Sequence, residues 1–433
     1  MKSIFWHRRD LRIEDNAGLY KALKSSETVI PIFVFDAYIL GDLPKDDQRV
    51  LYIYQQIEKL KIQYQKLGSD LKVFFGKPKD VILNLVKKEG VLNVYTNRDY
   101  EPYAIKRDLE LYNSLESLGV DFIGAKDHVV FEKNEVLKPD KKPYTIFTPY
   151  SKKWKAKINE FYLSSYPTLS YVEFLLKVDL TEPLVPLKDL GFDSNVKSPF
   201  PSEEILMDII NKYEERRDIP YIKGTSRLSL ALRFGTISIR KLAKIAINAN
   251  EKFLNELIWR DFYQTILYHF PDSVTKAFKP KYDNVEWIND ESLFKKWCEG
   301  KTGYPIVDAG MRELNETGFM HNRVRMITAS FLVKHLLIDW RWGESYFAMK
   351  LLDFELASNV GGWQWAASSG CDAAPYFRVF NPTLQQQKFD KEFKYIKKWV
   401  PEFGTTDYPS PIVEHAFARD RVIATYKKAL NNK

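Results

Sequence analysis

The spacing of apolar residues changes along the chain, and this change limits the folds that are open to it. Up to about residue 130, short apolar runs at 3–6, 28–35, 71–75, 91–96 and 120–123 alternate with polar stretches of helical spacing. This alternation predicts a parallel sheet with helices on both faces. From about residue 202 the strand patterns fade, and apolar residues recur at helical spacing instead. The sequence therefore predicts an α/β domain followed by a mostly helical domain. The expected helices lie at 202–217, 225–233, 238–249, 251–269, 305–317, 322–339 and 344–356.

The segment between the two patterns is rich in proline. Residues 128–201 hold eight of the 21 prolines, which predicts a long, partly ordered connector. We therefore expect an α/β domain at residues 1–130, a linker at 131–201 and a helical domain at 202–433.

The charge and cysteine content narrow the class of protein. Lys and Arg number 65 against 57 Asp and Glu, and this net charge of +8 permits a polyanionic partner without requiring one. Two cysteines cannot form a disulfide framework, which favours a reducing compartment. No apolar run approaches the roughly 18–20 residues of a membrane-spanning helix, and the start MKSIFWHRRDLR does not read as a signal peptide. We expect a soluble, cytoplasmic protein.

One helical face in the segment 251–270 mixes polar and aromatic side chains. Glu256, Trp259, Arg260 and Tyr263 lie at helical spacing among apolar residues. Burying these charges is costly unless a polar group faces them, so the face is a candidate ligand site. The alternative is a surface face with an ion pair between Glu256 and Arg260.

The segment 224–235 begins with small and hydroxyl-bearing residues. Gly224 permits close approach of a ligand, and Thr225 and Ser226 are good helix N-caps. Free amides at a helix start favour an anion such as phosphate. On this segment alone, however, a plain capped helix is the favoured interpretation.

Two further segments are candidates for the same site. In 320–337, Asn322, Arg325 and Met326 share a face from which Arg323 turns away, so the arginines can hold phosphates, pair with acids or lie on the surface. In 351–368, a Gly pair permits close approach of a flat group. We expect no metal site, because the histidines and cysteines lack metal-ligand spacing.

Five segments together resemble the cryptochrome/photolyase family, and most closely the class I DNA photolyases that repair cyclobutane pyrimidine dimers. The resemblance runs from residue 3 to about residue 415. The motifs are WHRRDLRIEDN, GTSRLS, NELIWRDFY, GKTGYPIVDAGMRELNETGFMHNRVRMITASFLVKHLLIDWRWGE and NVGGWQWAASSGCDAAPYFRVFNP. The resemblance implies a Rossmann-like first domain and an FAD-binding helical domain. It also implies that the protein is a monomer and that its partner is UV-damaged DNA.

The resemblance also implies roles for individual residues. Asn359 would lie against N5 of the flavin, and Glu355 stands where the family most often has Asp. The residues that match the family's cofactor positions are Tyr213, Thr225, Ser226, Arg227, Leu228, Ser229, Phe253, Glu256, Arg260, Tyr263, Arg325, Asp353, Glu355 and Asn359. Glu256 and Asn359 would be catalytic.

The implied substrate is a pyrimidine dimer, which enzymes of this family flip out of the duplex. The matching pocket residues are Glu256, Trp259, Asn322, Arg323, Met326 and Trp365. Trp287, Trp340 and Trp363 match a relay that passes electrons to oxidised flavin. A second, antenna chromophore is expected in the first domain. After Tyr100-Glu101 the chain reads Pro102-Tyr103-Ala104, which argues against methenyl-folate and leaves its identity open.

A blue-light photoreceptor of the cryptochrome type is the alternative from another functional class. Asn359 is the residue expected of a repair enzyme, and both pocket tryptophans are present. A photolyase for (6-4) lesions is disfavoured because Met326 stands near the place of the His expected there. The resemblance thus predicts light-driven repair of cyclobutane dimers.

Overall fold

The computed structural model describes residues 2–195 and 197–431, and these form two compact units. Unit 1 contains Met1–Glu132, Ala156–Glu204 and Arg227–Asn248, and unit 2 contains Lys133–Lys155, Ile205–Ser226 and Ala249–Lys433. The expected linker 131–201 is thus divided between the two units, and it includes helices α6 (Phe147–Lys157) and α7 (Glu160–Leu163). As limits of functional domains, 1–130, 131–201 and 202–433 stay a prediction.

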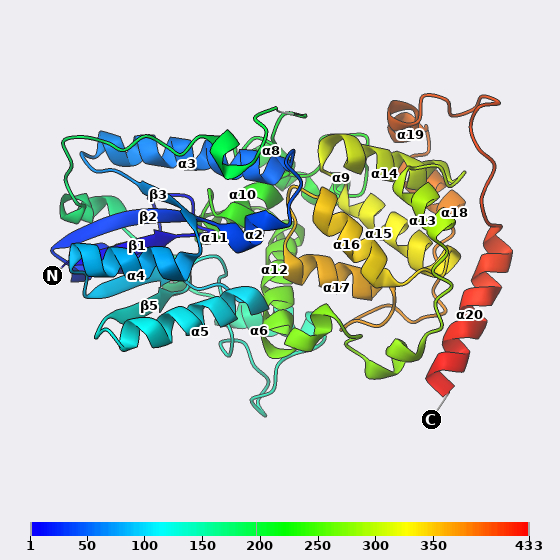
Figure 1. Ribbon diagram of the computed structural model, residues 1–433. Helices are drawn as coiled ribbons and strands as arrows, with labels where there is room; N and C mark the ends of the chain where they lie inside the picture. Colours follow the sequence, from blue (N-terminus) through cyan, green and yellow to red (C-terminus); the bar gives the residue numbers. More distant parts are fainter. Residues whose placement is uncertain (1, 196, 432–433) are drawn as a thin grey trace. The chain divides into compact units, whose positions relative to one another are not determined.

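Unit 1 is built on a five-stranded parallel sheet, which confirms the predicted α/β fold (Figure 1). Its strand order is β3-β2-β1-β4-β5, so the winding reverses between β1 and β4. In sheets of this kind ligands bind beyond the carboxyl ends of the strands at such a reversal. The strands are β1 (Lys2–His7), β2 (Thr28–Asp36), β3 (Lys72–Gly76), β4 (Asn93–Asn97) and β5 (Asp121–Ala125).

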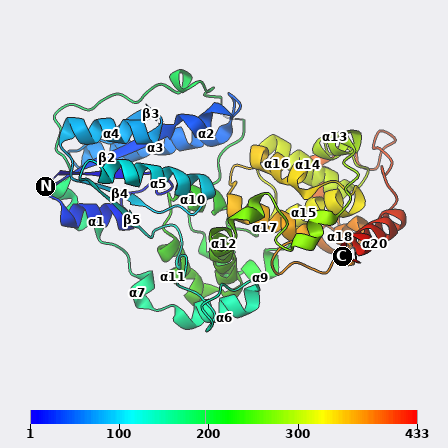
Figure 2. The same cartoon turned by 60° about the horizontal axis from the view of Figure 1, so that its bottom comes forward.

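Helices cover both faces of this sheet. Figure 2 shows α1 (Ala17–Ser25) on one side of the strands and α4 (Pro78–Glu89) on the other. Apolar side chains of α4 and α5 (Pro102–Glu116), such as Ile82 and Leu111, form one core with Ile4 of β1. Burial on both faces explains why the strand sequences are nearly continuous apolar runs. The remaining α-helices of this unit are α2 (Ala37–Gly41), α3 (Gln48–Lys66), α7, α10 (Ser229–Phe234) and most of α11 (Ile239–Ala249).

Unit 2 is helical, as predicted, and the five strands found in the described part of the chain all lie in unit 1. Its largest core is formed by α13 to α19 and contains Trp297, Trp340 and Trp363. The helices of this unit, besides α6, are α8 (Met207–Asn211), α9 (Tyr213–Arg216), α12 (Glu251–His269), α13 (Glu291–Cys298), α14 (Pro305–Thr317), α15 (Asn322–Ser330), α16 (Trp340–Lys350), α17 (Leu356–Ala366), α18 (Pro382–Phe389), α19 (Lys394–Trp399) and α20 (His415–Asn431). Among the residues that the structure describes, no helix is long and apolar enough to cross a membrane.

Candidate functional site

Helix α12 presents the mixed face that the sequence predicts. The helix starts where the side chain of Asn250 accepts a hydrogen bond from the backbone amide of Phe253. The structure gives the two charges on this face partners from other segments: Glu256 pairs with Arg217, and Arg260 pairs with Glu355 at 3.0 Å. The alternative of a simple surface pair between Glu256 and Arg260 is therefore wrong.

The surroundings of Glu256 make its neutral form easier to reach than for an exposed glutamate. Burial raises the pKa of this carboxyl above its ordinary value, and the neighbouring Arg217 guanidinium only partly opposes this effect. Burial has the larger effect on the pKa, because the carboxylate loses more favourable hydration energy than it gains from the adjacent cation. Glu256 can therefore act as a hydrogen-bond donor more readily than an exposed glutamate.

The two arginines of α15 point to different partners, as expected. Arg325 pairs with Asp353 at 2.9 Å and also donates to the carbonyl of Met320 at 2.7 Å. Arg323 pairs with Asp218 at 2.8 Å, and its guanidinium lies 4.4 Å from the ring centre of Phe389. Hydrogen bonds orient each guanidinium, so each presents fixed donors.

The other two residues of the expected α15 face differ in exposure. Met326 is half-buried, and its sulfur lies 3.6 Å from a guanidinium nitrogen of Arg323. Asn322, the first residue of the helix, is exposed. The methionine therefore lines the packed side of this face, and the asparagine lies at its rim.

Three polar side chains at the start of α17 meet partners from three helices. Arg325 of α15 reaches Asp353, and Arg260 of α12 reaches Glu355. The side-chain amide of Asn359 donates to Glu344 of α16 at 2.8 Å. The structure thus brings together Arg260, Arg325, Asp353, Glu355 and Asn359, five of the expected cofactor residues.

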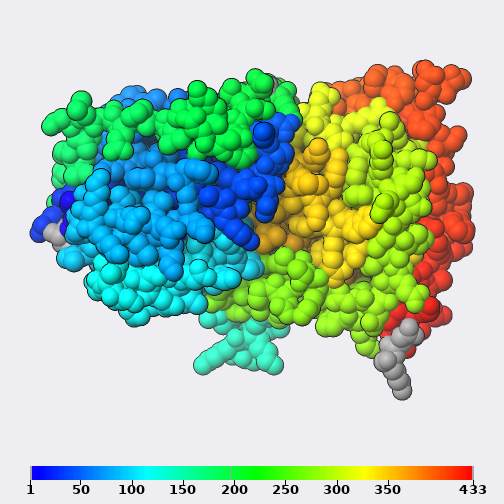
Figure 3. All heavy atoms as spheres, viewed as in Figure 1, coloured from blue at the N-terminus to red at the C-terminus, as the bar shows by residue number. Residues whose placement is uncertain are grey.

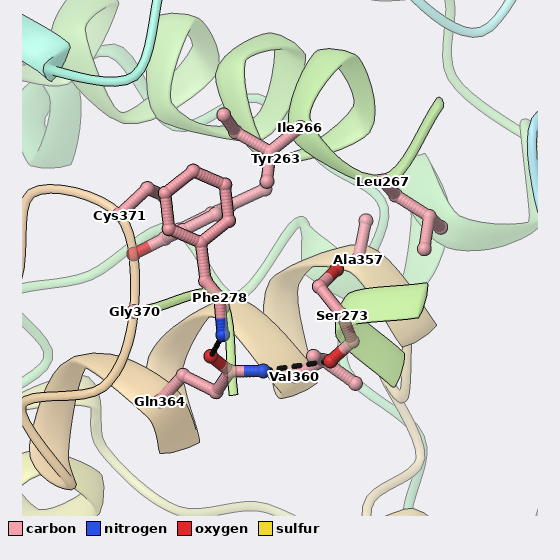
Figure 4. Close-up of a pocket in the computed structure, with 11 residues that line it drawn as sticks. Tyr263, Ile266, Leu267, Ser273, Phe278, Ala357, Val360, Gln364, Gly370 and Cys371 are labelled. Atoms are coloured by element: carbon pink, nitrogen blue, oxygen red, sulfur yellow. Dashed lines mark hydrogen bonds between the residues drawn. The ribbon is translucent and has the colours of Figure 1, made fainter. Parts of the chain in front are cut away.

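A small apolar cavity adjoins this region between α12 and α17 (Figure 4). Gly361 is required here, because a Cβ at this position would lie 2.3 Å from the ring of Tyr263. The Gln364 amide closes the cavity by accepting from Phe278 N at 2.8 Å and donating to Ser273 O at 2.6 Å. Tyr263 thus packs tightly between the two helices.

Trp259 lies in an aromatic cluster that the sequence did not reveal. Its ring stacks face to face on Phe147 of α6, with 3.7 Å between ring centres and 3° between planes. Trp365 packs less closely, with its ring centre 6.3 Å from that of Phe380. Both tryptophans are half-buried and so keep surface for a ligand.

The expectation that Thr225 or Ser226 caps a helix is wrong. Helix α10 starts only at Ser229, and Leu228 occupies the cap position without a side-chain hydrogen bond. Arg227 has a left-handed φ of +54°, and this conformation separates Thr225 and Ser226 from the first turn of the helix. The cofactor role of these residues stays a prediction. Thr225 and Ser226 belong to unit 2, and Arg227 to Ser229 belong to unit 1.

The remaining expected residues are placed as follows. Tyr213 meets Phe253 edge to face, with ring centres 5.2 Å apart. Trp340 and Trp363 are buried in the large core of unit 2, and Trp287 packs against that core while half-buried. Helix α16 approaches Trp363 closely at Gly343, where a Cβ would lie 2.1 Å from the indole.

Sequence reasoning missed Arg217, Asp218, Phe147 and Glu344. Each is the partner of an expected residue from a segment that is distant in sequence. Arg217 and Asp218 follow the short helix α9, which ends at Arg216, and apolar spacing in this region says nothing about the partners of charged residues. Only the fold could place these four residues at the site.

Comparison with known proteins defines the class. Residues 3–169 match the family model of DNA photolyase, and residues 253–406 match that of the FAD binding domain of DNA photolyase. A deoxyribodipyrimidine photo-lyase from Synechococcus sp. is 38% identical, over 98% of this chain and 96% of that protein. The chain therefore belongs to the DNA photolyase family.

Solved structures agree with this assignment. A bacterial class III photolyase from Agrobacterium tumefaciens has a TM-score of 0.88 at 31% identity, covering 99% of this chain and 97% of its own. An archaeal photolyase from Sulfolobus tokodaii, described with two FAD molecules that imply a novel light-harvesting cofactor, has a TM-score of 0.85 at 37% identity. That similarity covers 99% of this chain and all of the other.

Proposed function

We propose that this protein uses blue light to repair cyclobutane pyrimidine dimers in DNA, as a class I photolyase. Its similarity to deoxyribodipyrimidine photo-lyases extends over nearly the full length of both chains, which supports the reaction. The observation that carries the proposal is the convergence of partners from α12, α15 and α16 on Asp353, Glu355 and Asn359.

These polar groups fit the edge of a flavin, which presents both hydrogen-bond donors and acceptors. The carboxylates of Asp353 and Glu355 accept, the guanidinium groups donate, and the amide oxygen of Asn359 accepts. Bound and reduced FAD would, after absorbing blue light, supply an electron that splits the dimer and then returns to the flavin. The residues that would hold it are Tyr213, Thr225, Ser226, Arg227, Leu228, Ser229, Phe253, Glu256, Arg260, Tyr263, Arg325, Asp353, Glu355 and Asn359.

Asn359 would have an orienting role at this edge. Its amide nitrogen donates to the side chain of Glu344 at 2.8 Å and to the backbone oxygen of the same residue at 3.1 Å. Both bonds use the nitrogen, so the amide oxygen is the atom left to accept a hydrogen bond from a ligand.

The dimer would bind between aromatic walls. Trp259 and Trp365 offer apolar faces to a flipped-out dimer, and Met326 fills the space between rigid groups. Glu256, whose pKa is raised by burial, would donate a hydrogen bond to a base carbonyl. Asn322 would bond the base edges from the rim, and Arg323 would contact the flanking phosphates.

Trp287, Trp340 and Trp363 would carry electrons inward from the surface of unit 2. Their common packing against one core supports this role, as does the greater exposure of Trp287. An indole is comparatively easy to oxidise, so a chain of indoles is suited to such a relay.

The carboxyl edge of the sheet in unit 1 is the proposed site of a second chromophore. Arg107 lies 4.8 Å from the Trp6 ring centre, and Tyr103 stacks on Tyr38 at 4.8 Å while donating to Asp36 at 2.6 Å. Cations and flat rings at this edge suit an aromatic, anionic pigment. Its chemical identity stays open.

The test joins an absorption spectrum to a repair assay. We expect purified protein to carry one tightly bound FAD and to restore the bases of a defined thymine dimer under blue light. Flavin-free protein from a flavin-sufficient host would contradict the cofactor proposal. Flavin binding without repair would favour a photoreceptor of the cryptochrome type. Gel filtration tests the proposed monomer, and cell fractionation tests the proposed cytoplasmic location.

A further inference from the structure

Helix α6 lies antiparallel along α12 and begins beside Trp259. Each step of four residues along α6 is matched by a step of four backwards along α12. Such a pattern fixes the register of the two helices, because sliding either helix would break every contact together. The matched pairs are Lys155 with Glu251 at 2.6 Å, Ser151 with Asn255 at 3.4 Å, and Phe147 with Trp259 at 3.7 Å.

Phe147 and Phe262 hold the Trp259 ring from two directions. Phe147 covers one face of the indole, and its plane is only 3° from that of the indole. Phe262 is fully buried and meets both rings edge to face, at 5.6 Å from Trp259 and 5.9 Å from Phe147. Rotation of the indole would therefore break both aromatic contacts.

The start of α6 receives its cap from a distant segment. Helix α6 begins at Phe147, and the residue before it, Ile146, has no side-chain acceptor. Residues 139–142 just upstream are exposed and project from the surface (Figure 3). The carboxylate of Asp372 accepts from the Phe147 backbone amide at 3.1 Å, where a negative charge also suits the helix dipole.

Asp372 belongs to the loop that follows Trp365. Its φ of +50° is left-handed, a conformation that Gly and Asn adopt with little strain and most residues do not. One hydrogen bond therefore joins the loop after Trp365 to the helix behind Trp259. The two proposed walls of the dimer pocket are tied together through this bond.

We infer that Asp372 and Phe147 are positioning residues that fix the plane of Trp259 and its separation from Trp365, and thereby set the fit of the pocket to a dimer. This inference rests on the proposed repair function. Neither residue is required to touch the reacting bases. Their effect is on recognition of the lesion, and binding to undamaged duplex does not depend on them.

The test uses two pairs of variants in the full-length protein. Phe147→Leu keeps an apolar group but loses the flat face, whereas Phe147→Tyr keeps the ring. Asp372→Gly keeps the left-handed backbone but loses the acceptor, whereas Asp372→Asn keeps both. Fluorescence anisotropy at one salt concentration measures the Kd for a dimer-containing duplex and for the undamaged duplex.

We expect Phe147→Leu and Asp372→Gly to weaken dimer binding by about 2- to 10-fold, the range of an aromatic pair. The Tyr and Asn variants should bind like the wild type. Affinity for undamaged duplex and the flavin content should not change in any of the four.

Asp290→Ala is the matched control, because Asp290 caps α13 by accepting from Leu293 N at 2.9 Å. It should lower the unfolding midpoint without changing dimer affinity. If this control also loses dimer affinity, the losses in Phe147→Leu and Asp372→Gly reflect lower overall stability, and the inference is overturned.

Two results separate failure of the inference from failure of the function. Wild-type affinity in Phe147→Leu and Asp372→Gly, with affinity lost in Trp259→Ala, would overturn the positioning role and leave the repair function intact. Wild-type protein that binds flavin but fails to repair dimers would overturn the proposed function itself.

Discussion

The side chain of Glu344 accepts a hydrogen bond from the side-chain amide of Asn359, with 2.8 Å between the two atoms. The same amide nitrogen donates to the Glu344 backbone oxygen at 3.1 Å, so α16 holds α17 at this point by two bonds from one group. Burial raises the pKa of Glu344, while the bond from Asn359 opposes the rise. The pair fixes the orientation of a residue that we place at the flavin.

Replacing Glu344 should therefore have an effect that depends on the acceptor atom. Glu344→Leu leaves the half-buried amide of Asn359 without its side-chain acceptor, and we expect a loss of about 1–3 kcal/mol in the free energy of unfolding. Glu344→Gln keeps a carbonyl oxygen and should lose much less. Urea unfolding followed by tryptophan fluorescence measures both values. Equal losses in the two variants would show that the negative charge matters and the hydrogen bond does not.

The fold class could be predicted because burial leaves a regular pattern. Every apolar run in the first 125 residues coincides with a strand, for example 28–35 with β2 (Thr28–Asp36). A strand that is covered on both faces must be apolar throughout, and this requirement is readable from the sequence.

Helix ends were less predictable. The periodic run 322–339 forms α15 (Asn322–Ser330), a π-helical turn at Phe331–His335, and then Leu337 with a φ of +52°. Leucine seldom adopts this conformation, and only tertiary packing selects it. Likewise the expected helix 344–356 ends at Lys350, because Leu351 is already extended. Apolar spacing continues through such breaks and therefore conceals them.

Trp259→Ala should weaken binding to dimer-containing DNA by about 1–3 kcal/mol, the usual contribution of an aromatic ring stacked on a base. Binding to undamaged duplex relies on phosphate contacts, so its Kd and its salt dependence should stay near the wild-type values. Titration of both duplexes at several salt concentrations separates the two contributions. An equal loss on both would remove Trp259 from the dimer pocket.

Trp340→Phe should separate the electron relay from core packing. Trp340 is buried at 2% exposure, and phenylalanine keeps most of its apolar volume but is much harder to oxidise. We expect blue light and an external donor to bleach the flavin of this variant poorly. Enzyme reduced chemically with dithionite should still split dimers at the wild-type rate.

The two assays on Trp340→Phe exclude different ideas. Bleaching at the wild-type rate would show that Trp340 is not needed for the relay. Lost repair in a variant that retains reduced FAD would show that the residue supports the active site through its packing.

Lys334 should make the stability of the protein depend on pH in the alkaline range. The residue is 1% exposed, and its ammonium group donates to Ser368 Oγ at 2.9 Å and lies 4.1 Å from the Tyr426 ring centre. Burial lowers its pKa from 10.5 to about 7. Between these values the unfolded chain holds a proton that the folded chain has lost, so raising the pH favours the folded state. The free energy of unfolding of the wild type, minus that of Lys334→Met, should therefore rise by about 1.4 kcal/mol per pH unit in this window.

Below about pH 7 both states are protonated, so the difference should be constant there and the methionine variant should have its greatest relative stability. Urea unfolding of both proteins at matched pH values measures this difference, and parallel curves across the whole range would show that Lys334 keeps its proton in the folded protein.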